Sequence, residues 1–178
     1  LTAAEVINNY DKTDLVRILR MYGDERHAPR IAARIVAARS KTPITSTLQL
    51  AELVKSAIPA AARRTGGHPA RKTFQALRIE VNHELDALEE GLNAAIRWAN
   101  PGGRICVISY HSLEDRIVSH IFSEMSRGCT CPPDFPVCVC GNVPILHVRT
   151  RKALLASAGE VEGNPRARSA LMRVAEKL

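Results

Sequence analysis

The segment that most constrains the fold runs from residue 102 to residue 122, where a short apolar stretch is followed at once by an amphipathic one. Residues 104–109, with the sequence RICVIS, are rich in β-branched side chains, which predicts a strand buried on both faces of a sheet. Leu113, Ile117 and Ile121 then recur at helical spacing. A strand that leads directly into a helix is typical of an open α/β sheet, where substrates lie at the carboxyl ends of the strands.

The turn between this strand and the helix at 113–126 is unusually polar. Ser112 is expected to cap the helix, with Asp115 accepting a hydrogen bond from the backbone of the cap. His111 then lies in the turn itself, where it could face a substrate. The alternative is that His111, Glu114 and Asp115 only cap and solvate the start of a helix.

Breakers, caps and apolar spacing divide the rest of the chain. The apolar positions between Pro69 and Trp98 predict one long helix or two helices that meet near Asn82 and His83. Helical spacing or capping residues also predict helices at 3–9, 13–22, 25–39 and 46–57, and β-branched runs predict strands at 145–148 and 169–175. A long polar loop is expected between these two strands.

The chain is basic, with a formal net charge of +7, which favours a polyanionic partner. The basic side chains concentrate around the Gly66-Gly67 pair, where flexible backbone could follow a phosphate chain. They are Arg63, Arg64, His68, Arg71 and Lys72. For the arginines of the first helices, a solvated helix face is the alternative. No apolar run approaches the roughly 18 residues needed to span a bilayer, so a cytoplasmic protein is expected.

Two Cys-x-Cys pairs, Cys129 with Cys131 and Cys138 with Cys140, flank a proline-rich loop. Four thiolates in this arrangement could hold a structural zinc ion. Disulfides are one alternative, although a reducing cytosol argues against them, and unbound thiols are another. Cys106 lies within the predicted strand and is expected to be a small apolar core residue.

Arg166 and Arg168 precede the last predicted strand. In an extended segment their alternation would place both guanidinium groups on one side, a geometry suited to two phosphates or to a phosphate and a carboxylate. Ion pairs with Glu160 or Glu162 are the alternative.

Four segments together closely resemble the bacterial ribosomal RNA small subunit methyltransferase H family. They are residues 68–85 (HPARKTFQALRIEVNHEL), 102–118 (GGRICVISYHSLEDRIV), 129–141 (CTCPPDFPVCVCG) and 164–178 (NPRARSALMRVAEKL). The resemblance implies transfer of a methyl group from S-adenosylmethionine to N4 of a cytidine in small-subunit ribosomal RNA. It also implies an α/β fold: an incomplete class I, Rossmann-like methyltransferase sheet (69–178) with an inserted all-α domain (1–68).

The resemblance further implies roles for individual residues. His111 and Ser112 would form the wall facing the target base, with His111 orienting or deprotonating N4. Gln75, Arg78 and Asn82 would offer polar groups to the same cleft. From the basic cluster and from the arginine alternation described above, Arg71, Lys72, Arg166 and Arg168 are the candidates for contact with RNA. The expected partner is small-subunit ribosomal RNA or the assembled subunit, and exposed strand edges would also suit a homodimer.

The family's cofactor loop has no counterpart among these residues. Gly66-Gly67 and Gly102-Gly103 are the glycine pairs of the chain, and neither follows a predicted strand and opens a helix. The chain is therefore expected to be the C-terminal portion of a longer enzyme, with most of the S-adenosylmethionine pocket elsewhere, and to be inactive alone. Two alternatives are a non-enzymatic RNA-binding or ribosome-assembly module with a zinc loop, and a methyltransferase for another nucleic acid.

Overall fold

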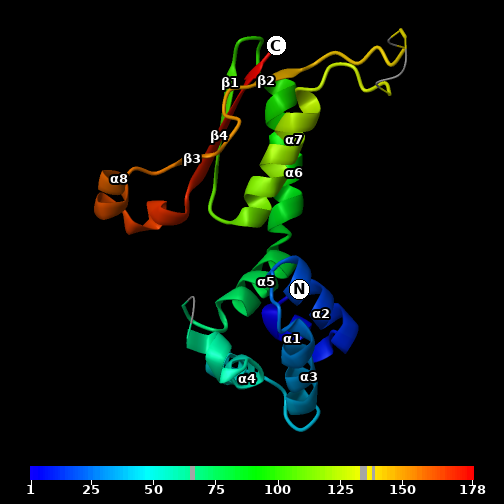
Figure 1. Ribbon diagram of the computed structural model, residues 1–178. Coiled ribbons are helices and arrows are strands. Elements are labelled where there is room, and N and C mark those ends of the chain that lie inside the picture. The colour runs from blue at the N-terminus through cyan, green and yellow to red at the C-terminus, as the bar shows by residue number, and fades with distance from the viewer. Residues whose placement is uncertain (65–66, 133–135, 138) are drawn as a thin grey trace. The chain divides into compact units, whose positions relative to one another are not determined.

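The computed structural model describes residues 1–64, 67–132, 136–137 and 139–178 (Figure 1). Internal contacts divide the chain into two compact units, Leu1–Glu84 and Leu85–Leu178. The first unit is helical and the second combines helices with a sheet. Among the described residues, no helix combines the length and apolar character that a membrane span requires.

Three helices of the first unit begin at a side-chain cap. Thr2 and Glu5 form a reciprocal capping box, and Asp11 and Ser46 cap two later helices. The elements are α1 (Ala3–Asn9), α2 (Lys12–Met21), α3 (Ala28–Arg39), α4 (Thr47–Ala57), the 3₁₀ helix η1 (Ala60–Arg64) and α5 (Arg71–Asn82). Helix α3 starts three residues later than expected because Pro29 fits only in the first turn.

Buried aliphatic side chains from all five α-helices form the core of this unit, and Leu15, Ile18 and Ile31 are completely buried. One carboxylate lies at the edge of this core. Glu80 Oε1 on α5 accepts a hydrogen bond of 2.8 Å from the Tyr10 hydroxyl and lies 3.5 Å from Arg17 Nη2. The hydrogen bond to Glu80 raises the pKa of Tyr10. One carboxylate on α5 thereby contacts a residue at the end of α1 and a residue of α2.

The long helical pattern is broken at His83, so the alternative of two helices is the correct one. His83 has a φ of 51°, in the left-handed region, and separates α5 from α6 (Glu84–Trp98). Helix α5 packs against α2 and α1, so contacts assign it to the first unit and not, with α6, to the second. The division at 68/69 into an inserted domain and a catalytic part stays a prediction.

The second unit is organised around its final strand. Strand β4 (Leu171–Lys177) pairs antiparallel with β1 (Arg104–Ser109) on one side and with β2 (Leu146–Val148) and β3 (Leu154–Leu155) on the other. Helix α7 (Ser112–Met125) follows β1, and α8 (Ala158–Gly163) and the 3₁₀ helix η2 (Pro165–Ser169) precede β4. Side chains of α6 and α7 pack with Ile105, Leu146 and Ala175 of the sheet.

Several expectations for this unit are wrong. Strand β1 is not buried on both faces: Ile105 and Ser109 are buried, whereas Cys106 and Ile108 are exposed. The helices that pack on the sheet cover one face of this strand, so Cys106 is not a core residue. The loop before the last strand contains β3, α8 and η2, and β4 begins at Leu171 because residues 165–169 are helical.

Candidate functional site

The polar turn after β1 is fixed by a capping box one residue earlier than expected. His111 is the N-cap of α7, and its Nδ1 accepts a hydrogen bond of 3.4 Å from the Glu114 backbone N–H. Glu114 Oε2 accepts hydrogen bonds from the backbone N–H groups of Tyr110 (2.7 Å) and His111 (3.2 Å). Ser112 and Asp115 therefore do not form the cap. Glutamate three positions after His111 was the available signal, but histidine is not among the preferred N-cap residues.

The imidazole of His111 is held within the start of the helix. Its side chain is 14 % exposed, and Nε2 lies 3.2 Å from Glu114 Oε1 without the alignment of a hydrogen bond. Because Nδ1 accepts from the backbone, hydrogen bonding assigns the proton of the neutral ring to Nε2. The lone pair of Nδ1 therefore already accepts a hydrogen bond from the helix backbone. The role of His111 toward a target base stays a prediction.

Asp115 connects α7 to the central strand. Its two oxygens accept hydrogen bonds of 2.7 and 2.8 Å from Nε and Nη2 of Arg173, and both side chains are largely buried. This bidentate contact raises the pKa of Arg173. The pair lies in the wall of an open cavity of about 470 Å³, which is lined by Ser112, Asp115, Arg116, Ser119, His120, Leu171 and Arg173. Hydroxyl, guanidinium and imidazole groups in such a groove suit a polar, anionic ligand.

The predicted basic cluster lines a second cavity, within the first unit. Its volume is about 270 Å³, and His68, Arg71 and Lys72 lie in its wall together with Arg26 and His27. Lys72 Nζ donates a hydrogen bond of 2.7 Å to the Asp24 carbonyl, so this ammonium is partly committed. The side chains of Arg63 and Arg64 are outside the description. His27 was missed because it is distant in sequence and lies just before α3.

Three polar residues are predicted to face the substrate. In the structure, each of them forms a polar contact with another residue of the first unit. Gln75 Nε2 donates to the Tyr22 carbonyl at 3.2 Å. Arg78 Nη2 lies 2.8 Å from Glu84 Oε2, and Asn82 Nδ2 donates to Glu84 Oε1 at 3.0 Å. These contacts support the junction after α5, and a role in a substrate cleft stays a prediction.

Arg166 and Arg168 do not lie in an extended segment. They belong to η2, where Asn164 caps the helix through a 3.2 Å hydrogen bond to the Arg166 backbone N–H. In a 3₁₀ helix, residues two apart point about 120° apart, so the prediction of one shared side is wrong. Among the described residues neither arginine forms an ion pair with Glu160 or Glu162, and a contact with RNA stays a prediction.

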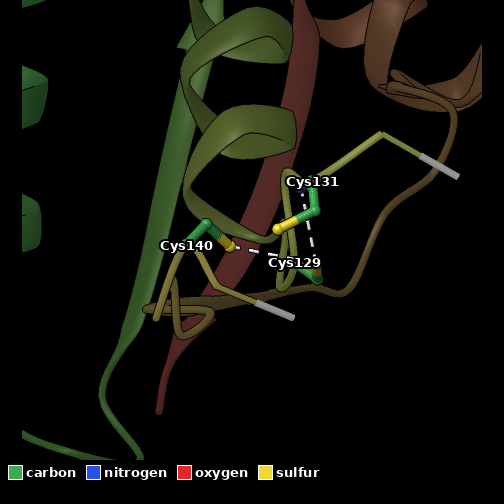
Figure 2. Close-up of side chains that lie close together, drawn as sticks. All are labelled: Cys129, Cys131 and Cys140. Atoms are coloured by element: carbon green, nitrogen blue, oxygen red, sulfur yellow. Dashed lines mark hydrogen bonds between the residues drawn. The ribbon is translucent and has the colours of Figure 1, made fainter. Parts of the chain in front are cut away.

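The cysteine loop brings three sulfur atoms together. The Sγ atoms of Cys129, Cys131 and Cys140 all lie within 4.8 Å of one another (Figure 2). The fourth cysteine of the predicted set, Cys138, lies outside the described residues.

Known proteins resemble this chain along its whole length. The profile of the MraW methylase family matches residues 1–178. Relatives from Symbiobacterium thermophilum and Brevibacillus brevis are 56 % and 54 % identical over the full chain, and one from Heliobacterium modesticaldum is 56 % identical. Each is named ribosomal RNA small subunit methyltransferase H, and the chain spans 56–57 % of their lengths. The resemblance that the sequence motifs indicated is confirmed: the chain belongs to the MraW methylase family.

Proposed function

We propose that these residues form part of an S-adenosylmethionine-dependent enzyme that methylates N4 of a cytidine in small-subunit ribosomal RNA. The observation that supports this most strongly is the 56 % identity, over all 178 residues, to a relative named for a ribosomal RNA methyltransferase. A non-enzymatic RNA-binding module has less support, because the three relatives described above are all named as methyltransferases.

The chemistry defines what the chain's own residues would have to do. The lone pair of the exocyclic N4 of cytosine is delocalised into the ring, so the reaction depends on holding N4 in line with the methyl group and on accepting its proton. The base must also leave its stack to be reached. The groove beside Ser112, Arg116 and His120 offers hydrogen-bond donors and positive charge at the carboxyl end of β1, where a flanking phosphate or the base could be held.

S-adenosylmethionine would supply an electrophilic methyl group on a sulfonium. The described residues do not form the usual pocket for it, because the turn from β1 into α7 contains Tyr110 and His111 instead of glycines. We therefore assign no cofactor contact to this chain. Its contribution under this proposal is to the RNA side, through the α7 groove and the basic cavity that contains His68, Arg71 and Lys72.

A chimera tests the proposal. The matching part of the Symbiobacterium thermophilum relative would be replaced by these 178 residues, and the product incubated with labelled S-adenosylmethionine and small ribosomal subunits from a strain lacking the methylation. We expect label in N4-methylcytidine when the RNA nucleosides are separated by mass spectrometry. A folded chimera that transfers no methyl group, while the parent relative does, would contradict the proposal. Label in another nucleoside or in another nucleic acid alone would contradict the assigned substrate.

A further inference from the structure

The loop between α7 and β2 holds three cysteine sulfurs in the geometry of metal ligands. Cys129 Sγ and Cys140 Sγ are 3.8 Å apart, and Cys131 Sγ lies within 4.8 Å of both. Zinc–sulfur bonds of about 2.3 Å in a tetrahedral site place neighbouring sulfurs about 3.8 Å apart. In Figure 2 the three side chains come from two separate stretches of the loop and lie close together.

Backbone hydrogen bonds hold these sulfurs in place. The Cys131 N–H donates to Cys129 Sγ at 3.4 Å, the Thr130 N–H to Cys140 Sγ at 3.3 Å, and the Val139 N–H to Cys131 Sγ at 3.4 Å. Each of the three sulfurs thus accepts one backbone hydrogen bond. Hydrogen bonds to ligand atoms are a regular feature around bound metals.

Apolar packing does not explain why the loop holds this shape. Val137, Val139 and Val143 are about 70 % exposed, at 69, 72 and 71 %. The ends of the loop are joined by Asn142, whose Nδ2 donates to the carbonyls of Arg127 (3.1 Å) and Gly128 (2.6 Å). The loop is closed at its base, and its described residues supply almost no core, which is the situation in which a bound metal supplies the missing stabilisation.

We propose that Cys129, Cys131 and Cys140 bind one zinc ion as thiolates. Thiolate ligands in tetrahedral arrangement select zinc over harder divalent cations such as magnesium and calcium. Binding exchanges three thiol protons, released to solvent, for three Zn–S bonds, and a further donor completes the tetrahedron. The ion would be structural, fixing the connection from α7 to β2. The proposal does not depend on methyl transfer, since it concerns metal content.

Metal analysis of the 178-residue chain tests this proposal, with Cys106 as a matched control. Cys106 is an exposed cysteine on β1, outside the loop. Four proteins would be compared: the parent chain and the variants Cys129→Ser, Cys140→Ser and Cys106→Ser. Each would be reduced, incubated with zinc, freed of excess metal and analysed by mass spectrometry. We expect one zinc per chain in the parent and in Cys106→Ser, and none in the two loop variants.

Cobalt provides a second readout that reports the ligands directly. Tetrahedral Co²⁺ bound by thiolates gives intense visible bands and a sulfur-to-cobalt charge-transfer band. We expect both in the parent and in Cys106→Ser, and their loss in the loop variants while the helical circular dichroism is retained. A reduced parent chain with unchanged helix content that binds neither metal would overturn the proposal, as would zinc retained by Cys129→Ser and Cys140→Ser. The proposal would also be overturned if these cysteines were isolated as a disulfide and the protein bound no zinc after that disulfide was reduced.

Discussion

His111 shows how a single residue can satisfy two different hypotheses until its hydrogen bonds are known. Its position after a strand is that of a residue facing a substrate, yet Nδ1 caps α7 and Nε2 lies beside Glu114. A capping residue and a base-facing residue make different demands on the side chain. Capping requires only an acceptor atom near the helix start, whereas proton transfer or orientation of a cytosine requires an imidazole.

Two substitutions at His111 separate these demands. In the active chimera, His111→Ala removes both functions, while His111→Asn keeps a good N-cap and removes the ring. We expect the single-turnover methylation rate to fall by about 10²-fold or more in both variants, the range typical of a lost proton-transfer group. Only His111→Ala should also lose about 1 kcal/mol of stability in urea unfolding. An unchanged rate in His111→Asn would reduce His111 to a helix cap.

Glu176 gives the sheet a dependence on pH. Its carboxylate on β4 lies 2.9 Å from Arg149 Nη2 and 3.4 Å from Arg104 Nε. The hydrogen bond from Arg149, followed by that from Arg104, lowers the pKa of Glu176 from its ordinary value of 4.5. A carboxylate with a lowered pKa in the folded state stabilises the fold above 4.5, and this contribution disappears as the pH falls through the lowered value.

Glu176→Gln is therefore expected to lower the urea midpoint of the chain at neutral pH and to have little effect in strong acid, where the parent carboxyl is protonated too. Glu89→Gln, on the exposed surface of α6, is the control and should leave the midpoint unchanged at both pH values. Equal losses at neutral and acid pH would show that the ion pairs of Glu176 do not carry the effect.

Sequence reasoning worked for caps made by common capping residues. The Thr2–Glu5 capping box follows from residue type and spacing alone. It placed the cap of α7 at Ser112 because serine is the commoner N-cap, and the structure uses His111. Which of two adjacent polar residues caps the helix depends on where the preceding strand ends, and β1 ends at Ser109, opposite Leu171 of β4.

Among the elements, α1 and α3 illustrate how an arginine can serve the fold instead of a ligand. Arg39, near the end of α3, donates to the backbone carbonyls of Ile7 (2.6 Å) and Tyr10 at the end of α1. The last carbonyls of a helix lack partners within the helix, and a cation there also opposes the negative end of the dipole. One of the basic residues of the first helices is thereby accounted for by structure.

Arg39→Ala should leave those carbonyls without their donor and lower the free energy of unfolding by about 1–3 kcal/mol. Arg34→Ala on the exposed face of the same helix is the matched control, with an expected change within about 0.5 kcal/mol. Circular dichroism during urea unfolding measures both. Equal effects of the two substitutions would contradict a capping role for Arg39.

Whether a segment forms a helix or a strand was more predictable than how many faces of that element are covered by others. The apolar spacing gave α5 and α6 and the break between them, but the apolar run of β1 predicted two covered faces where α6 and α7 cover one. Alternating arginines suggested an extended segment at 166–168. The Asn164-Pro165 pair, a cap followed by a residue suited to the first helical position, was the stronger local signal.

For the molecule as a whole, membership of the MraW methylase family could be anticipated from four sequence segments, whereas the division into units could not. The basic Gly66-Gly67 stretch looks like a boundary in the sequence. The contacts place the division after Glu84, because the apolar face of α5 packs against α2 and α1. Tertiary packing of this kind has no local sequence signature.

At this scale the chain's own capacity for the cofactor can be measured. We expect isothermal titration calorimetry to detect no micromolar binding of S-adenosylmethionine to the 178-residue chain, because no described turn provides the glycine-rich contact that the cofactor requires. The active chimera serves as the positive control. Micromolar binding to the chain alone would show that its residues do contain a methyl-donor site.

The central position of β4 also governs when the second unit can form during synthesis. Every strand pairing in the described sheet includes residues 171–177, while β1, β2 and β3 are translated earlier and do not pair with one another. On a translating ribosome the pairings that these three strands make with β4 can form only after β4 leaves the exit tunnel. These pairings therefore form late, and premature termination anywhere before Leu171 would remove all of them.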